Sequence, residues 1–309
     1  MNTDQYSNKI TCAYLYSITK YGYPSDVRNT VQYIDEMKSM GFSSIELEAI
    51  GEANVEYMFK HYPLIAEQLT SANCSVPVFC IVLPKLGSAY SSEQAKSLEL
   101  FDKGCITANQ LGANAVLDNS PLLPLEYPKN APIQRHYSSA TLSRIGLPAG
   151  FDWNNYWLSL TNTFQKACAI AANYNLSYHL HPCEGSLITG TESFLNFASS
   201  VKSENLLFNL DTANQFYYKD NLPLSLLRLS KKVSYIHISD NRGNLVDHLV
   251  PGDGEIDRNS FFAMLRTIDF KGNFAIDVGG AETNIADIRQ AYIRSANWLN
   301  EKLSAYALN

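Results

Sequence analysis

The chain has 309 residues, of which 46% are hydrophobic, and a formal net charge of −6. This acidic balance argues against a nucleic-acid partner, because phosphate binding relies on clustered Lys and Arg and the one adjacent basic pair is Lys231–Lys232. No segment approaches the roughly 18 apolar residues of a membrane span. The six scattered cysteines and an N-terminus without an apolar leader lead us to expect a cytoplasmic protein.

Short apolar runs alternate with longer amphipathic segments along the whole chain. The predicted strands are 11–17, 44–49, 76–83, 114–118, 177–182, 206–211, 233–239 and 273–278. Between them, apolar residues at three- and four-residue spacing predict helices, for example at 25–40, 153–174, 258–268 and 282–304. Because no linker divides these strand–helix units, we predict an α/β fold, a single (β/α)8 TIM barrel domain over residues 1–309. An open doubly wound sheet usually carries a glycine-rich loop after its first strand, and none follows 11–17.

The connection after the fourth predicted strand, residues 119–152, is unusually long. It holds five prolines and no clear periodicity. Loops of this length in a compact domain are usually functional or disordered. In a barrel it would emerge on the face that carries the active site. It is therefore either a lid or subunit-contact loop that carries Arg135, His136 and Tyr137 toward substrate, or a surface insertion. A subunit-contact loop would be compatible with a homo-oligomer.

Histidines and carboxylates gather at the ends of the late predicted strands. They are His179, His181, His237 and His248, together with Glu184, Asp211, Asp240 and Asp277. Because the carboxyl ends of barrel strands converge on one site, these residues are expected to be neighbours. Buried carboxylates without partners cost several kcal/mol, and one divalent cation would satisfy them together. Mixed His and carboxylate ligands suit Mn, Zn, Co or Fe better than Mg or Ca.

Single residues in this set have alternative readings. Asp211 by itself is typical of a helix N-cap, and His237 by itself is typical of a hydrogen-bonded core histidine. On the fifth predicted strand, His179 and His181 share one face and Glu184 follows where the chain leaves the strand. Any of these three can complete a metal site, which leaves the others for proton transfer or for substrate hydroxyls.

Two further segments complete the predicted site. On the second strand, Glu48 lies nearer the carboxyl end and is expected to touch substrate, whereas Glu46 is read as a buried structural acid. After the seventh strand, His248 precedes the turn-rich segment 251–257, whose Gly252 and Gly254 are read as turn residues.

With these residues in place, the chain resembles the xylose-isomerase-like barrels, the sugar phosphate isomerase/epimerase group. His179, His181 and Glu184 match a His-x-His-x-x-Glu segment, Asp211 matches the strand-six Asp, and PGDGEID resembles a glycine loop of the family. His237 and Asp240 match the strand-seven His-x-x-Asp. The family usually ends strand eight in a metal-binding Glu, where this chain has Asp277. In epimerases of the group a strand-five Glu is both ligand and base, and the resemblance leaves open that a histidine occupies this position here.

The resemblance implies a divalent-metal-dependent isomerase or epimerase acting on a small carbohydrate. Such an enzyme removes a proton beside a carbonyl and passes through a metal-stabilised enediolate. The catalytic candidates are His181, Glu184 and Asp277. The predicted ligands of the divalent ion are Glu184, Asp211, His237 and Asp277. The predicted substrate contacts are Glu48, His179, Arg135, His248 and Asp240.

Three alternatives remain open from the sequence. Because strands five and eight depart from the two-glutamate pattern, a lyase or dehydratase acting on a keto-sugar, keto-glycoside or keto-inositol is the first. A non-catalytic sugar-binding barrel is the second. A DNA-repair endonuclease of the same barrel type is the third, and it would need a basic groove and more histidines.

Overall fold

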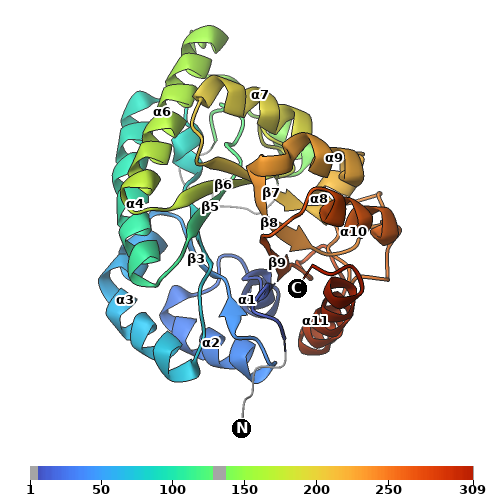
Figure 1. The fold of residues 1–309 in the computed structure, drawn as a ribbon. Helices are drawn as coiled ribbons and strands as arrows, with labels where there is room; N and C mark the ends of the chain where they lie inside the picture. The colour runs from blue at the N-terminus through green and yellow to red at the C-terminus, as the bar shows by residue number, and fades with distance from the viewer. Residues whose placement is uncertain (1–5, 128–136, 309) are drawn as a thin grey trace.

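In the computed structural model, which describes residues 6–127 and 137–308, a barrel of parallel strands is surrounded by helices (Figure 1). The strand order is β2-β1-β9-β8-β7-β6-β5-β4-β3. The strands are β1 (Ile10–Cys12), β2 (Ser44–Ile45), β3 (Leu47–Ile50), β4 (Val78–Val82), β5 (Ala115–Asn119), β6 (Ser177–His181), β7 (Leu206–Asp211), β8 (Val233–Ile238) and β9 (Asn273–Ile276).

The barrel closes at Glu46. This residue separates β2 from β3, which are two halves of the strand predicted at 44–49. β2 pairs with β1 and β3 pairs with β4, so the two ends of the strand order meet at Glu46. The nine short strands therefore make an eight-stranded barrel, and the predicted α/β TIM barrel is confirmed.

Helices flank this barrel, most of them on its outside, as the spacing of their apolar residues predicts (Figure 1). They are α1 (Leu15–Tyr21), α2 (Thr30–Ser39), α3 (Glu52–Ala72), α4 (Ser91–Gln110), α5 (Ser139–Leu142), α6 (Trp153–Asn173), α7 (Thr191–Val201), α8 (Thr212–Tyr217), α9 (Leu222–Leu229), α10 (Arg258–Thr267) and α11 (Ile288–Ala305). Short 3-10 turns occur at η1 (Val27–Asn29), η2 (Pro84–Gly87) and η3 (Ser230–Lys232). Helix α6 shows the pattern clearly, because Leu160, Phe164, Ala167 and Ala171 are all buried along one face.

Apolar side chains fill the barrel beneath its carboxyl end. Seven buried residues form this inner cluster: Ala13, Val78, Cys80, Ala115, Leu117, Tyr235 and Ala275. Most are small, as the crowded interior of a barrel requires. The larger core lies between the strands and the helices. Polar residues on the same inward faces are thereby held in a layer above the inner cluster.

Some predicted boundaries are wrong. The helix predicted at 25–40 is the 3-10 turn η1 followed by α2, which begins at Thr30. The first strand, predicted at 11–17, ends at Cys12 because the chain turns directly into α1 at Leu15. The last helix, predicted from 282, begins at Ile288 because the side chain of Asp287 accepts a hydrogen bond from the backbone N–H of Gln290 at 3.0 Å. That bond is an N-cap and fixes the start of the helix.

The long connection after β5 is only partly described. Arg135 and His136, predicted to approach substrate, lie outside the described residues. Tyr137 packs against Tyr127 with ring centroids 5.0 Å apart, and α5 follows directly. Among the helices of the described part of the chain, none is both long and apolar enough to cross a membrane.

Candidate metal centre and its pocket

Four side chains from adjacent strands form a candidate metal centre at the carboxyl end of the barrel. His181 ends β6, Asp211 ends β7, His237 lies in β8, and Asp277 directly follows β9. One ligand atom from each lies within 4.8 Å of the others. Asp211, His237 and Asp277 are buried, and His181 is half-buried. The structure thus brings together three of the predicted ligands and adds His181.

The orientation of His237 fits a bound cation. Its Nε2 lies 2.8 Å from Oε1 of Glu46, which accepts the hydrogen bond. Its Nδ1 is buried, has no hydrogen-bond partner in the described part of the chain, and lies 3.6 Å from Oδ2 of Asp277. With the ring proton on Nε2, a lone pair on Nδ1 faces a carboxylate oxygen. Two such electron-rich atoms need a proton or a cation between them.

The other half of the centre joins His181 to Asp211. Nε2 of His181 lies 2.9 Å from Oδ2 of Asp211, and its Nδ1 lies 3.4 Å from Sγ of Cys183. Oδ1 of Asp211 accepts the backbone N–H of Asn214 at 2.9 Å, which caps helix α8. The N-cap reading of Asp211 is confirmed and is compatible with the predicted ligand role, because one oxygen caps the helix and the other faces the cluster.

The charges in this cluster shift one another strongly. Burial lowers the pKa of His181, but Cys183 and Asp211 outweigh it and raise the value to about 9. Burial likewise opposes a charge on His237, yet the Glu46 and Asp277 carboxylates hold its pKa well above the usual range. In turn, despite burial, the histidines keep the pKa values of Asp211 and Asp277 below their usual range. The site is thus built around compensated positive and negative charge.

His248, predicted to contact substrate, lies behind the cluster instead. It is fully buried, with Nε2 at 3.4 Å from Oδ2 of Asp211 and at 3.6 Å from Oδ2 of Asp277. Its backbone N–H donates to Oγ1 of Thr283 at 2.8 Å. It supports the carboxylates and does not line the pocket.

Glu184, predicted as a ligand and as a catalytic group, does not join the cluster. It lies on the loop after β6, where the hydroxyl of Tyr217 donates to its Oε1 at 3.4 Å. It lines a small neighbouring cavity of about 30 Å³. His181 joins the cluster because its side chain leaves the strand directly into the barrel, whereas Glu184 follows after the chain has turned away.

His179 and Asp240, predicted substrate contacts, are also placed elsewhere. His179 lies one layer below His181, with Nε2 at 3.0 Å from Oγ of Ser177, and burial lowers its pKa to about 3. Asp240 forms an ion pair with Arg258 and accepts the backbone N–H of Gly252 at 2.8 Å. Neither residue lines the pocket at the metal centre, so both have structural positions.

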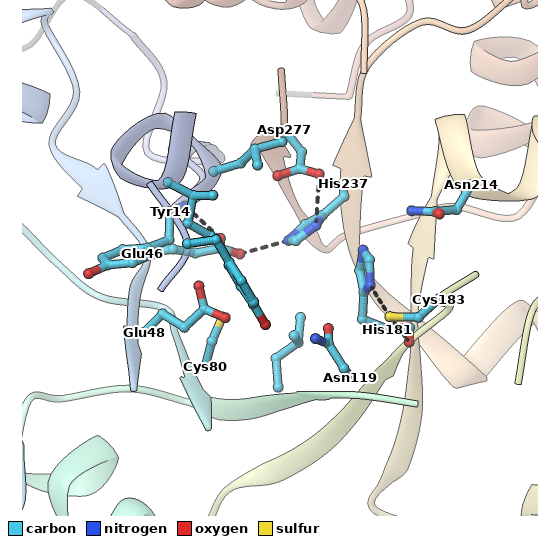
Figure 2. Close-up of a pocket in the computed structure, with 14 residues that line it drawn as sticks. Tyr14, Glu46, Glu48, Cys80, Asn119, His181, Cys183, Asn214, His237 and Asp277 are labelled. Carbon is cyan, nitrogen blue, oxygen red and sulfur yellow. Dashed lines mark hydrogen bonds and ion pairs between the residues drawn. The ribbon is translucent and has the colours of Figure 1, made fainter. Parts of the chain in front are cut away.

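A pocket of about 60 Å³ lies directly against the metal centre (Figure 2). Beyond His181, His237 and Asp277, its wall is made by Tyr14, Leu15, Ile18, Tyr23, Glu46, Glu48, Cys80, Leu117, Asn119, Cys183 and Asn214. Figure 2 shows Glu48 across this space from Asp277, and its contact with substrate stays a prediction.

Several polar lining residues were missed from the sequence. Asn119 ends β5, and Asn214 follows Asp211 by three residues and donates to its Oδ2 at 2.8 Å. The signal for both was their position at or just after the carboxyl end of a strand, which the sequence prediction considered only for histidines and carboxylates.

Comparisons with known proteins agree with this geometry. The family described as xylose isomerase-like TIM barrel matches residues 34–302. An inosose dehydratase of Clostridium botulinum (strain Alaska E43 / Type E3) is 24% identical over 166 residues, 48% of this chain and 55% of that protein. An L-ribulose 3-epimerase of Methylomonas sp. (strain DH-1) is 32% identical over 95 residues, 30% of this chain and 31% of that protein. The chain therefore matches about half or less of the length of these curated relatives.

Solved structures resemble the whole chain. An L-ribulose 3-epimerase superposes with a TM-score of 0.71 at 16% identity and covers 96% of this chain and 95% of its own. The 3-keto-D-glucoside 4-epimerase YcjR from E. coli superposes with a TM-score of 0.70 at 14% identity. The match covers 95% of this chain and 99% of that one. The IOLI protein with a bound zinc atom superposes with a TM-score of 0.69 at 17% identity. The match covers 96% of this chain and 98% of that one. At these identities the likeness establishes the fold.

Proposed function

This chain belongs to the xylose isomerase-like TIM barrel family, and from that membership we propose that it is a divalent-metal-dependent isomerase or epimerase of small carbohydrates. The observation that carries the proposal is the cluster of His181, Asp211, His237 and Asp277 at the wall of a pocket. The two aligned relatives named above are enzymes of carbohydrate chemistry, which supports the substrate class.

The four cluster residues are the proposed metal ligands. A divalent cation held there would polarise a substrate carbonyl and stabilise the negative charge that develops when the neighbouring carbon loses its proton. The donor set of two imidazoles and two carboxylates suits Mn, Zn, Co or Fe. Glu184, placed outside the cluster, is not proposed as a ligand.

The chain's own residues would move the proton. Asp277 is the proposed base, because its carboxylate reaches the pocket at the metal centre. Glu48 faces the same space from β3, where its carboxylate can hold a substrate hydroxyl or return a proton from the opposite side. Return to the same carbon on the opposite face gives an epimer, and return to the adjacent carbon gives an aldose–ketose pair.

A dehydratase is the second candidate, and the composition of the cluster favours it. The cluster contains no glutamate, and its residue on β6 is His181, whereas the family resemblance implies a strand-five Glu in epimerases. The partial match to an inosose dehydratase points the same way. In that reaction, removal of the proton beside the carbonyl is followed by loss of a hydroxyl from the next carbon as water.

One experiment tests both reactions. Metal-depleted protein is incubated with a panel of keto-sugars and keto-inositols in D2O, with and without added Mn²⁺ or Zn²⁺, and the products are followed by NMR and mass spectrometry. An isomerase or epimerase gives an isomer of the substrate that carries deuterium from the solvent at the carbon that lost its proton. A dehydratase gives a product lighter by one water. Absence of any metal-dependent exchange across the panel would count against both reactions.

A further inference from the structure

Glu46 reaches the metal centre from the opposite part of the barrel wall. It lies at the break between β2 and β3, whereas His237 lies in β8, three places away in the strand order. Its side chain is 2% exposed, and Figure 2 shows it extended into the pocket toward His237. A buried carboxylate at this position needs partners.

Three donors converge on this carboxylate. Oε1 accepts from the Tyr235 hydroxyl at 2.7 Å and from Nε2 of His237 at 2.8 Å. Oε2 accepts from the backbone N–H of Tyr14 at 3.0 Å. The Tyr14 N–H belongs to the main chain and the Tyr235 hydroxyl to the packed inner cluster, so the carboxylate is held in one orientation. His237 is thereby fixed at a position set by the segment after β1 and by the break at Glu46.

This arrangement decides which nitrogen of His237 can bind a metal. Nδ1 is the nitrogen that faces Asp277, at 3.6 Å from its Oδ2. A cation bound by Nδ1 requires the single ring proton to be on Nε2. In this buried setting the Nε2–H needs an acceptor, and Glu46 is the acceptor that the structure supplies.

A glutamine at position 46 cannot replace this function. Glu46 accepts from donors on both oxygens, but an amide offers one oxygen and one NH2 group. If the amide oxygen faces Tyr14, the NH2 group meets the Nε2–H of His237. If the oxygen faces His237, the NH2 group meets the N–H of Tyr14. One donor then confronts another in either orientation.

We propose that Glu46 is a positioning residue that fixes the tautomer and orientation of His237 and so sets the affinity of the centre for a divalent cation. This inference rests on the proposed metal function. It assigns to Glu46 a role beyond that of a buried structural acid, without direct contact with substrate or metal.

The test compares metal affinity and metal spectra in wild type, E46Q, H237A and Y235F. Y235F is the matched control, because it removes one donor to Glu46 and leaves the bonds to His237 and Tyr14. Affinity for Mn²⁺ is measured by titration of metal-depleted protein, and the visible absorption of the Co²⁺-loaded protein reports on its ligands. E46Q is expected to lose about 10- to 100-fold in Mn²⁺ affinity, the usual effect of removing an outer-sphere partner. Its Co²⁺ spectrum is expected to approach that of H237A, while Y235F keeps the wild-type spectrum.

The outcomes separate this inference from the proposed function. If wild type binds Mn²⁺ and E46Q binds it equally tightly with the wild-type Co²⁺ spectrum, the role of Glu46 is overturned and the metal function stands. If wild type itself binds neither ion, the metal function fails, and the inference fails with it. Should E46Q not fold, E46D keeps the charge but ends short of His237. The proposal then predicts the same loss of affinity, and wild-type affinity in E46D overturns it.

Discussion

The two histidines of the candidate centre are held by partners of different strength. His237 donates to the buried Glu46 carboxylate, whereas Nδ1 of His181 meets the thiol of Cys183 at 3.4 Å. A thiol is a weak hydrogen-bonding group, while a carboxylate is a strong acceptor. We therefore expect His237 to be the more rigid ligand and His181 the more adjustable one.

Replacement of His181 by alanine should remove a ligand, whereas replacement of Glu184 should not. H181A is expected to lose at least 10-fold in Mn²⁺ affinity, because three ligands and a cavity remain where four groups stood. E184A, on the loop that directly follows β6, is the matched control and is expected to keep wild-type affinity. Titration of both metal-depleted variants with Mn²⁺ checks this. Loss of affinity in E184A together with wild-type affinity in H181A would restore the ligand set predicted from the sequence.

The carboxyl group of Asp118 on β5 makes the stability of the fold depend on pH. Burial raises its pKa to about 8, although the backbone N–H of Leu83 donates to its Oδ1 at 3.3 Å. In the unfolded chain the same carboxyl has a pKa of about 3.9. Between these two values the unfolded chain has released a proton that the folded protein retains. The contribution of Asp118 to stability is therefore present at low pH and is lost as the pH rises toward 8.

The variant D118N keeps the shape of this side chain and removes its titration. Its free energy of unfolding should fall less between pH 5 and pH 8 than that of wild type, by on the order of 2 kcal/mol or more. Urea unfolding at both pH values measures the difference. The same pH dependence in the two proteins would show that Asp118 titrates normally in the folded state.

At the scale of elements, Asp240 organises the segment between β8 and α10. Its carboxylate forms an ion pair with Arg258 and accepts the backbone N–H groups of Gly252 and Ile256 at 2.8 and 3.2 Å. A Cβ on Gly254 would lie 2.4 Å from Oδ1 of Asp240. Gly254 is therefore required by close approach to this carboxylate, and Gly252, with φ of +108°, by its turn.

Removal of the Asp240 carboxylate should cost stability and leave the metal centre intact. D240A leaves the half-buried Arg258 guanidinium and two N–H groups without their acceptor, for an expected loss of about 3 kcal/mol. Urea unfolding measures the loss, and Mn²⁺ titration of the still-folded variant provides the control. A variant of normal stability that has lost binding of a carbohydrate would restore the substrate contact predicted from the sequence.

How far the sequence predicts each element depends on whether its signal is local. The strand at 206–211 is found at its predicted bounds, and α6 lies within one residue of them, because an apolar run or a repeated apolar face defines each. The start of α1 depended on how β1 packs in the barrel, and no local pattern marks it. The break at Glu46 coincides with a contact to His237 in β8, nearly two hundred positions along the chain, which no local pattern marks.

At the scale of the molecule, barrel topology made the candidate site predictable in outline. Because the strands are parallel and adjacent, Asp211, His237 and Asp277 had to converge, and they do. The choice between His181 and Glu184 depended on where the chain leaves β6. The supporting positions of Asp240 and His248 depended on how the later loops fold back. Those features come from tertiary packing, which residue types and spacing do not encode.

Binding of a cation should stabilise the whole fold. Metal at 100 times its dissociation constant adds about 2.7 kcal/mol to the free energy of unfolding. For a chain of this size we expect the melting temperature to rise by about 5 °C. Thermal unfolding of metal-depleted protein, with and without Mn²⁺, checks this. A rise of equal size in H181A would mean that the stabilising ion binds elsewhere.

The metal content of the purified chain tests the central claim most directly. Wild type and H237A are equilibrated with Mn²⁺ or Zn²⁺, dialysed, and measured by elemental analysis, with circular dichroism to confirm that both are folded. We predict one divalent ion per chain in wild type and none in H237A. A folded wild-type protein without bound metal, or H237A with the full wild-type content, would contradict the account.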